Sequence, residues 1–198
     1  MTNTTKDSIL DAAKASAQAH GYAGLNFRDI AKQVGIKSAS IHYHFPSKAD
    51  LGLAVAKRYW QDTKKILDRK TEALPDPKDR LRWYPSLFRH ALEHDNRMCL
   101  CSFMSAEYDA LPAALRAEVQ IFATVNLEWL ERTLRDAGPS SSPPAPAASG
   151  AQLTAAQQAQ AIFAAVTGAQ LLARSRNDIS IFDSAIESYR AAGVLPSG

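Results

Sequence analysis

The chain has 198 residues, of which 46% are hydrophobic and 22% charged, and its formal net charge is +3. This composition is typical of a folded globular protein and excludes a generally disordered chain. The longest apolar stretch, residues 161–173, is shorter than the roughly 20 residues of a membrane helix, and Met1 to Asp11 shows no secretory signal pattern, so we expect a cytoplasmic protein without a membrane segment.

Positive charge is concentrated in the first third of the chain. Residues 1–70 contain twelve Lys or Arg and six Asp or Glu, whereas residues 71–198 contain eleven and fourteen. A basic segment of this kind is a candidate for binding a polyanion such as DNA. Charge alone leaves open that the asymmetry arises by chance.

Two helices are predicted at the N-terminus. Thr4 and Asp7 have the spacing of a capping box, and Gly21 provides the C-terminal cap of the helix that they start. Asn26 caps a second helix, which Gly35 ends after about two turns. Both helices therefore have local start and stop signals.

A third short helix is predicted over residues 39–44. Ser47 and Asp50 then form another capping box, and a long helix follows from residue 48 to about residue 71, before Pro75. The first 50 residues are therefore predicted to fold as a small helical domain.

The rest of the chain also has helical periodicity, and no segment alternates in the manner of a strand. Pro85 predicts a kink or a restart within one of these helices, and residues 138–150 have the composition of a loop. We expect an all-α protein of about nine helices, with a helix-turn-helix domain over 1–50 and a larger helical ligand-binding and dimerisation domain over 51–198. The later helices are predicted from residue 76 through Leu92 and over 100–109, 112–136, 154–173 and 179–192.

Residues 26–44 have the layout of a helix-turn-helix: two short helices, a tight turn at a glycine, and apolar anchors on the second helix. With Ile41 and Phe45 turned inward, the polar side chains between Lys37 and His44 remain available for phosphates and base edges. Geometry alone leaves open an ordinary three-helix packing unit with a polar surface.

The run from Asn26 to Leu51, which includes Tyr43-His44-Phe45 and Phe-Pro-Ser-Lys, resembles the DNA-binding signature of the tetracycline-repressor-like (TetR) family. The resemblance covers about residues 5 to 55. It implies a cytoplasmic dimer that represses transcription at double-stranded operator DNA until a small molecule enters a pocket in its C-terminal domain. His42 departs from the Tyr found in many relatives, which leaves the contact at that position undefined.

The resemblance also implies which residues meet DNA. Tyr43 and Lys48 match positions that the family commonly uses on phosphates, and Lys37 to Ser40 match the base-facing start of the recognition helix. The predicted DNA-binding residues are Asn26, Arg28, Lys37, Ser38, Ala39, Ser40, His42, Tyr43, His44 and Lys48.

The C-terminal part is predicted to hold the dimer contact and the effector pocket. The last two helices combine small residues around Gly168 with larger apolar ones, which lets helices approach closely and predicts a homodimer through them. Aromatic and soft side chains in the middle helices predict a pocket for a small aromatic or hydrophobic effector. The predicted ligand-binding residues are Trp83, Leu87, Phe88, Cys99, Phe103, Met104, Tyr108, Phe122 and Trp129.

The sequence also bears on four other functions. The alternative function is a repressor that senses oxidants or electrophiles through Cys99 and Cys101. The two cysteines could also surround a zinc ion together with His90 and His94, but the C-x-C spacing is atypical of a structural zinc site. An architectural DNA-binding protein without a ligand stays open. No nucleophile motif, phosphate loop or cofactor fingerprint is present. We therefore expect no enzyme, no catalytic residues, no cofactor and no metal site.

Overall fold

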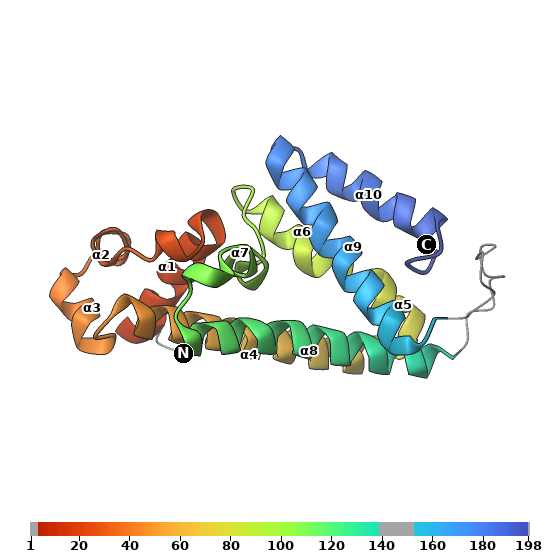
Figure 1. Ribbon diagram of the computed structural model, residues 1–198, viewed down its shortest axis with the longest axis horizontal. Coiled ribbons are helices and arrows are strands. Elements are labelled where there is room, and N and C mark those ends of the chain that lie inside the picture. Colours follow the sequence, from red (N-terminus) through yellow and green to blue (C-terminus); the bar gives the residue numbers. More distant parts are fainter. Residues whose placement is uncertain (1–3, 139–152, 198) are drawn as a thin grey trace. The chain divides into compact units, whose positions relative to one another are not determined.

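The computed structural model describes residues 4–138 and 153–197, and within these ranges it is built from helices alone (Figure 1). The predicted all-α fold class is confirmed. The α-helices are α1 (Thr5–His20), α2 (Phe27–Val34), α3 (Ser38–His44), α4 (Lys48–Ala73), α5 (Pro77–Trp83), α6 (Pro85–Glu93), α7 (Leu100–Ala106), α8 (Ala113–Ala137), α9 (Ala155–Arg176) and α10 (Ile179–Ala191), and two short 3₁₀-helices are η1 (Tyr22–Gly24) and η2 (Tyr108–Ala110). The loop predicted over residues 138–150 lies, apart from Gly138, outside the described residues.

The predicted capping signals form the expected hydrogen bonds. Thr4 and Asp7 make a reciprocal capping box at the start of α1. Ser47 and Asp50 do the same before α4, where the main-chain N–H of Ser47 donates to Asp50 Oδ2 at 3.0 Å and that of Asp50 to Ser47 Oγ at 3.2 Å. These helix starts follow from contacts between residues three apart, so the sequence could specify them.

Pro85 divides the helix that was predicted from residue 76 onward. α5 ends at Trp83 and α6 begins at Pro85, with Tyr84 between them in helical conformation. Proline has no N–H to donate to the preceding turn, so a new helix begins there. This restart, one of the two expected outcomes, gives ten α-helices in the described part of the chain where about nine were predicted.

Two compact units divide the described residues. The first comprises the residues up to 63 together with 97–122, and the second comprises 64–96 together with the residues from 123 onward. α1, α2 and α3 thus share a unit with α7 and η2. The predicted domain boundary between residues 50 and 51 stays a prediction.

The second unit is organised around α6, α9 and α10, which pack against one another. Phe88, Ile162, Val166 and Phe182 are buried in it. Buried Gln170 donates from Nε2 to the main-chain oxygen of Phe88 at 2.7 Å, which satisfies a polar group inside this apolar core. No helix in the described ranges combines the length and apolarity needed to cross a membrane.

Candidate nucleic-acid interface

The turn between α2 and α3 is built by local chemistry. Asn26 Oδ1 accepts hydrogen bonds from the main-chain N–H groups of Arg28 and Asp29, at 2.9 and 3.3 Å, and so starts α2. Gly35 has φ 76° and ψ 30°, the left-handed conformation that ends a helix, and its N–H donates to Ala31. The chain then enters α3 within three residues. Asn26, predicted to meet DNA, is therefore also the N-cap of α2.

The recognition helix α3 has one buried and one exposed face. Ile41 is completely buried and Phe45 is 3% exposed, as predicted for its anchors. Tyr43 is 85% exposed, and His42 is also exposed. An aromatic ring left almost entirely in water gains nothing from burial in this chain, so Tyr43 is available to an external partner.

The other predicted DNA contacts surround this face. Arg28, Lys37 and Ala39 are exposed, while Ser38, Ser40 and His44 are partly buried in the same short segment. The sequence pattern therefore identified side chains that reach the surface, although their contact with DNA stays a prediction.

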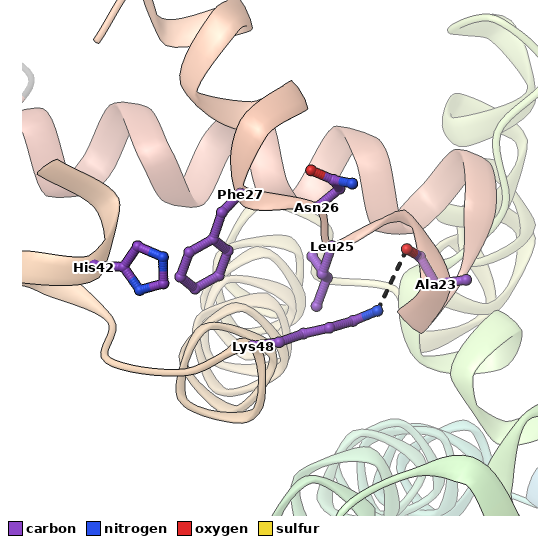
Figure 2. Close-up of a pocket in the computed structure, with 6 residues that line it drawn as sticks. All are labelled: Ala23, Leu25, Asn26, Phe27, His42 and Lys48. Atoms are coloured by element: carbon purple, nitrogen blue, oxygen red, sulfur yellow. Dashed lines mark hydrogen bonds between the residues drawn. The ribbon is translucent and has the colours of Figure 1, made fainter. Parts of the chain in front are cut away.

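A groove with a volume of about 360 Å³ opens beside α3 (Figure 2). The Phe27 ring meets the His42 imidazole edge to face, with ring centroids 4.6 Å apart. This contact joins α2 to α3 and positions His42, and the sequence pattern did not indicate it. The groove is lined by Ala23, Leu25, Asn26, Phe27, His42 and Lys48.

Lys48 is held at the edge of this groove. Its Nζ donates to the main-chain oxygen of Ala23 at 3.4 Å (Figure 2). The same Nζ lies 4.5 Å from the centre of the Tyr22 ring. The N-terminus of α2, which carries partial positive charge, borders the same groove through Asn26 and Phe27. An ammonium group beside a helix N-terminus suits a phosphate group.

The predicted effector-binding residues fall into both units. In the second unit, Trp129 stacks on Tyr84 with centroids 5.7 Å apart and meets Trp83 at 6.3 Å, while Phe88 meets Tyr84 at 5.6 Å. Leu87, in the same unit, is partly buried. The Tyr84 hydroxyl donates to buried Asn126 at 2.9 Å.

The sequence pattern did not indicate that Tyr84 belongs to this aromatic cluster or that Asn126 and Gln170 hydrogen-bond to its members. Asn126 lies on an otherwise apolar face of α8, and Gln170 interrupts an apolar stretch of α9. A polar residue within an apolar face was therefore the available signal, since a buried polar group needs a partner.

The remaining predicted effector residues belong to the first unit. Cys99, Met104 and Phe122 are buried, Phe103 is partly buried, and Tyr108 is 39% exposed. The Phe122 ring packs 5.4 Å from that of Tyr59. The predicted effector-binding residues therefore form two groups, one in each unit.

The two cysteines are buried and are not paired in a disulfide. Burial raises the pKa of Cys99, and burial together with the neighbouring Cys99 raises the pKa of Cys101 well above its usual value. The pKa of the Tyr59 hydroxyl, which hydrogen-bonds the Cys99 thiol, is also raised by burial. Protonated thiols are poor nucleophiles, so this setting opposes reaction with electrophiles.

α9 presents an apolar outward face. Leu171 and Leu172 are 57% and 49% exposed, whereas Ala169 and Ala173 are buried within the chain. Gly168 is exposed on the outward face, and a Cβ atom added to it would meet no atom within 4 Å. Large apolar side chains left in water beside a small residue suit close contact with a second helix.

Known proteins resemble this chain in sequence and in fold. Residues 9–55 match the sequence profile described as "Bacterial regulatory proteins, tetR family". A segment of 46 residues is 48% identical to the biofilm operon icaADBC HTH-type negative transcriptional regulator IcaR of Staphylococcus aureus strain Newman. That segment makes up 23% of this chain and spans only 25% of the length of that relative.

Solved structures resemble almost the whole chain. A TetR transcriptional regulator from Legionella pneumophila is 28% identical, with a TM-score of 0.83 over 96% of this chain and 97% of the other. A TetR-family regulator from Agrobacterium tumefaciens is 27% identical, with the same TM-score and the same two coverages. These relatives are transcription regulators, in agreement with the prediction that the chain is not an enzyme.

Proposed function

We propose that this chain is a member of the tetR family of bacterial regulatory proteins, whose sequence profile matches residues 9–55, and that it is a transcriptional repressor that binds palindromic operator DNA as a homodimer in the cytoplasm. The observation that carries this proposal is the exposed face of α3, with Tyr43 85% in water above the buried anchors Ile41 and Phe45. The Staphylococcus aureus relative is a negative transcriptional regulator, and we infer the same sign of regulation here.

DNA binding in this proposal uses both shape and charge. α3 enters the major groove, where its exposed side chains meet base edges. Lys48 and the N-terminus of α2 bind a backbone phosphate at the groove beside α3. The ten predicted contact residues, from Asn26 to Lys48, are proposed on this basis.

Dimerisation is proposed through the last two helices, with the outward face of α9 at the contact. Leu171 and Leu172 supply apolar area, and Gly168 allows close approach. Two recognition helices related by a twofold axis would then meet half-sites about 34–36 Å apart.

A small aromatic or hydrophobic molecule is proposed as the effector that releases the DNA. The aromatic cluster of Trp83, Tyr84, Phe88 and Trp129 supports such a ligand, since apolar and aromatic side chains with few polar groups line most small-molecule sites. The two recognition helices can have a spacing that fits the DNA half-sites or one that does not. An effector that binds the second arrangement more tightly shifts the dimer toward it and so weakens DNA binding.

Operator binding is the test of this proposal. DNA flanking the gene is footprinted with the purified protein, and a labelled duplex carrying the protected sequence is then titrated at several salt concentrations. We expect protection of a palindrome and a preference of at least a thousandfold over unrelated DNA. Equal affinity for operator and unrelated DNA would refute the repressor and favour an architectural DNA-binding protein.

A ligand screen tests the effector. Small apolar compounds are tested for a rise in melting temperature, because a ligand that binds the folded state stabilises it. Each stabilising compound is then added to the protein–operator complex. We expect at least one to release the DNA, and stabilisation without release would contradict its role as an effector.

A further inference from the structure

The last turn of α6 and the residue that follows it, His94, carry two imidazoles and a carboxylate close together. The ligand atoms of His90, Glu93 and His94 all lie within 4.8 Å of one another, and the two imidazole centroids are 4.3 Å apart. All three side chains are exposed. We propose that these three residues bind a divalent late first-row transition-metal ion such as Zn²⁺.

The spacing suits a single ion. Residues three and four positions apart are neighbours on a helix, and His94 follows α6 directly as its C-cap, so both other ligands lie close to His90. A tetrahedral site with metal–nitrogen distances of about 2.0–2.1 Å holds its ligand atoms roughly 3.4 Å from one another. Exposed side chains close the remaining gap by rotation, without movement of the main chain.

A hydrogen bond prepares His94 for this role. Its Nδ1 lies 2.8 Å from the main-chain oxygen of His90. A carbonyl oxygen can only accept, so Nδ1 carries the hydrogen and the neutral ring presents its lone pair on Nε2. Metal-binding histidines commonly have their other ring nitrogen held in this way.

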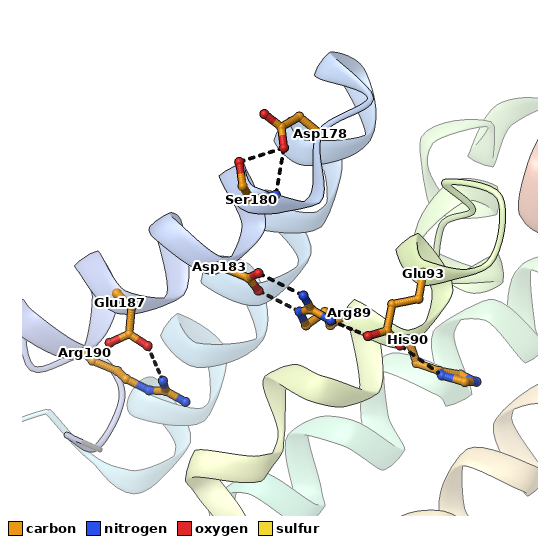
Figure 3. Close-up of polar contacts among 8 residues, drawn as sticks. All are labelled: Arg89, His90, Glu93, Asp178, Ser180, Asp183, Glu187 and Arg190. Carbon is orange, nitrogen blue, oxygen red and sulfur yellow. Dashed lines mark hydrogen bonds and ion pairs between the residues drawn. The ribbon is translucent and has the colours of Figure 1, made fainter.

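The charges around the cluster favour a cation. Arg89 donates to Glu93 and also makes two hydrogen bonds to Asp183 of α10, at 2.7 and 2.9 Å (Figure 3). Two carboxylates thus face one guanidinium. The C-terminal end of α6, where the cluster lies, adds partial negative charge. A bound ion would draw Glu93 away from Arg89, which keeps Asp183 as its partner.

The turn after α6 is anchored to α9. Asn96 Nδ2 donates to the main-chain oxygen of Arg174 at 3.1 Å, and the Arg174 guanidinium donates back to the main-chain oxygen of Asn96. This pair fixes the main chain two residues beyond His94. The course of the main chain just after His94 is therefore set by packing against α9.

The donor set selects the ion. Two imidazole nitrogens and one carboxylate suit Zn²⁺, Ni²⁺ or Cu²⁺, whereas Mg²⁺ and Ca²⁺ prefer oxygen ligands. Three protein ligands leave at least one position for water. The cysteines that the sequence analysis grouped with His90 and His94 are buried and have raised pKa values, and Glu93 takes their place in the proposed site.

Calorimetric titration of the full-length, tag-free protein with Zn²⁺ tests the site. We expect one ion per chain, an affinity at least tenfold weaker in His90→Ala and in His94→Ala, and no detectable binding of Mg²⁺. His20→Ala is the matched control, because His20 is also an exposed histidine in the last turn of a helix. Unchanged Zn²⁺ affinity in the His90→Ala and His94→Ala proteins would overturn the proposal.

Absorption spectroscopy of bound Co²⁺ distinguishes this site from a metal site at the cysteine thiols. With Co²⁺ as the probe, we expect d–d bands that vanish in a His90→Ala/His94→Ala protein and no sulfur charge-transfer band. A sulfur band that survives this double substitution would assign the ion to Cys99 and Cys101 and refute the site on α6. Circular dichroism of each variant checks folding, which replacement of exposed side chains should not disturb. The result does not depend on DNA binding, so the metal site and the repressor are tested separately.

Discussion

Glu107 Oε2 accepts a hydrogen bond of 2.6 Å from the main-chain N–H of Tyr22, a residue 85 positions earlier in the chain. A second link, 3.1 Å long, joins the N–H of Met98 to the main-chain oxygen of Gln18. The helix-turn-helix is thus hydrogen-bonded to the segment around α7 and η2. Its stability and position should depend on residues that sequence reasoning assigned to the other domain.

Gly21 allows this approach, and its replacement tests the link. A Cβ atom at Gly21, which has φ +64°, would lie 2.3 Å from Glu107 Oε2. Glu107 would have to move and leave the Tyr22 N–H without its partner, at a cost of about 1–3 kcal/mol. We expect Gly21→Ala to lower the free energy of unfolding in urea by at least about 1 kcal/mol more than Gly35→Ala.

Gly35 is the matched control because it also has positive φ but no atom lies within 4 Å of an added Cβ. Repeating both substitutions in a Glu107→Ala protein should shrink the difference, since residues in contact are not additive. The contact has no energetic role if Gly21→Ala and Gly35→Ala lower the free energy of unfolding equally in the otherwise wild-type protein. The same conclusion follows if Gly21→Ala remains the more destabilising of the two in the Glu107→Ala protein.

Removal of charge at Lys48 should change the salt dependence of DNA binding. Lys48→Ala is expected to weaken operator binding and to reduce the slope of log K against log salt by about one, because one phosphate contact is lost. Tyr43→Ala is expected to weaken binding with little change in slope. Fluorescence anisotropy over a salt series measures both, with Lys78→Ala on α5 as the control. Wild-type slope and affinity in Lys48→Ala would rule out the phosphate contact.

A large side chain at Gly168 should separate the dimer without harming the protomer. A Cβ atom at Gly168 has no atom within 4 Å beyond its chain neighbours and its own helical main chain, whereas a leucine there should overpack a close contact with a second helix at a cost of about 1–3 kcal/mol. We expect the dimer dissociation constant in analytical ultracentrifugation to rise about tenfold or more. Ala117→Leu, an exposed position on α8, is the control. An unchanged Gly168→Leu dimer would place the interface elsewhere.

Acid should weaken the link between α6 and α10. Hydrogen bonds from Arg89 hold the pKa of Asp183 below its ordinary value. A carboxyl group with a lowered folded-state pKa adds stability above its unfolded pKa of about 3.9, and this stability is lost as the pH falls through the folded-state value. Asp183→Asn should therefore be less stable than wild type in urea at pH 7, with a smaller difference near pH 3. A difference independent of pH would mean that the carboxylate charge does not contribute.

The buried thiols should be slow to react in the folded protein. Because burial raises the pKa of both Cys99 and Cys101, few thiolates exist at neutral pH. We expect mass spectrometry to show little alkylation by iodoacetamide until urea unfolds the chain, and operator binding to resist quinones and enals. Rapid labelling of the native protein with release of DNA would instead support electrophile sensing.

The helices and their caps could be predicted from the sequence, because they depend on residues close together in the chain. The Thr4–Asp7 and Ser47–Asp50 boxes formed as predicted. The helical spacing of five residues in the sequence also indicates one face of α8, and all five are buried in the structure: Leu115, Val119, Phe122, Asn126 and Trp129. The signature from Asn26 to Leu51 likewise indicated the DNA-binding family, since its residues are consecutive.

The contacts between helices distant in sequence could not be predicted in this way. Helical periodicity gives the faces of each helix, but it does not say which neighbour each face meets. The Tyr22–Glu107 hydrogen bond joins residues 85 apart, and Gln170 reaches a carbonyl 82 residues away. The outward position of Gly168 also depends on how α9 packs against α6 and α10. These features arise from the packing of whole helices, which no local pattern specifies.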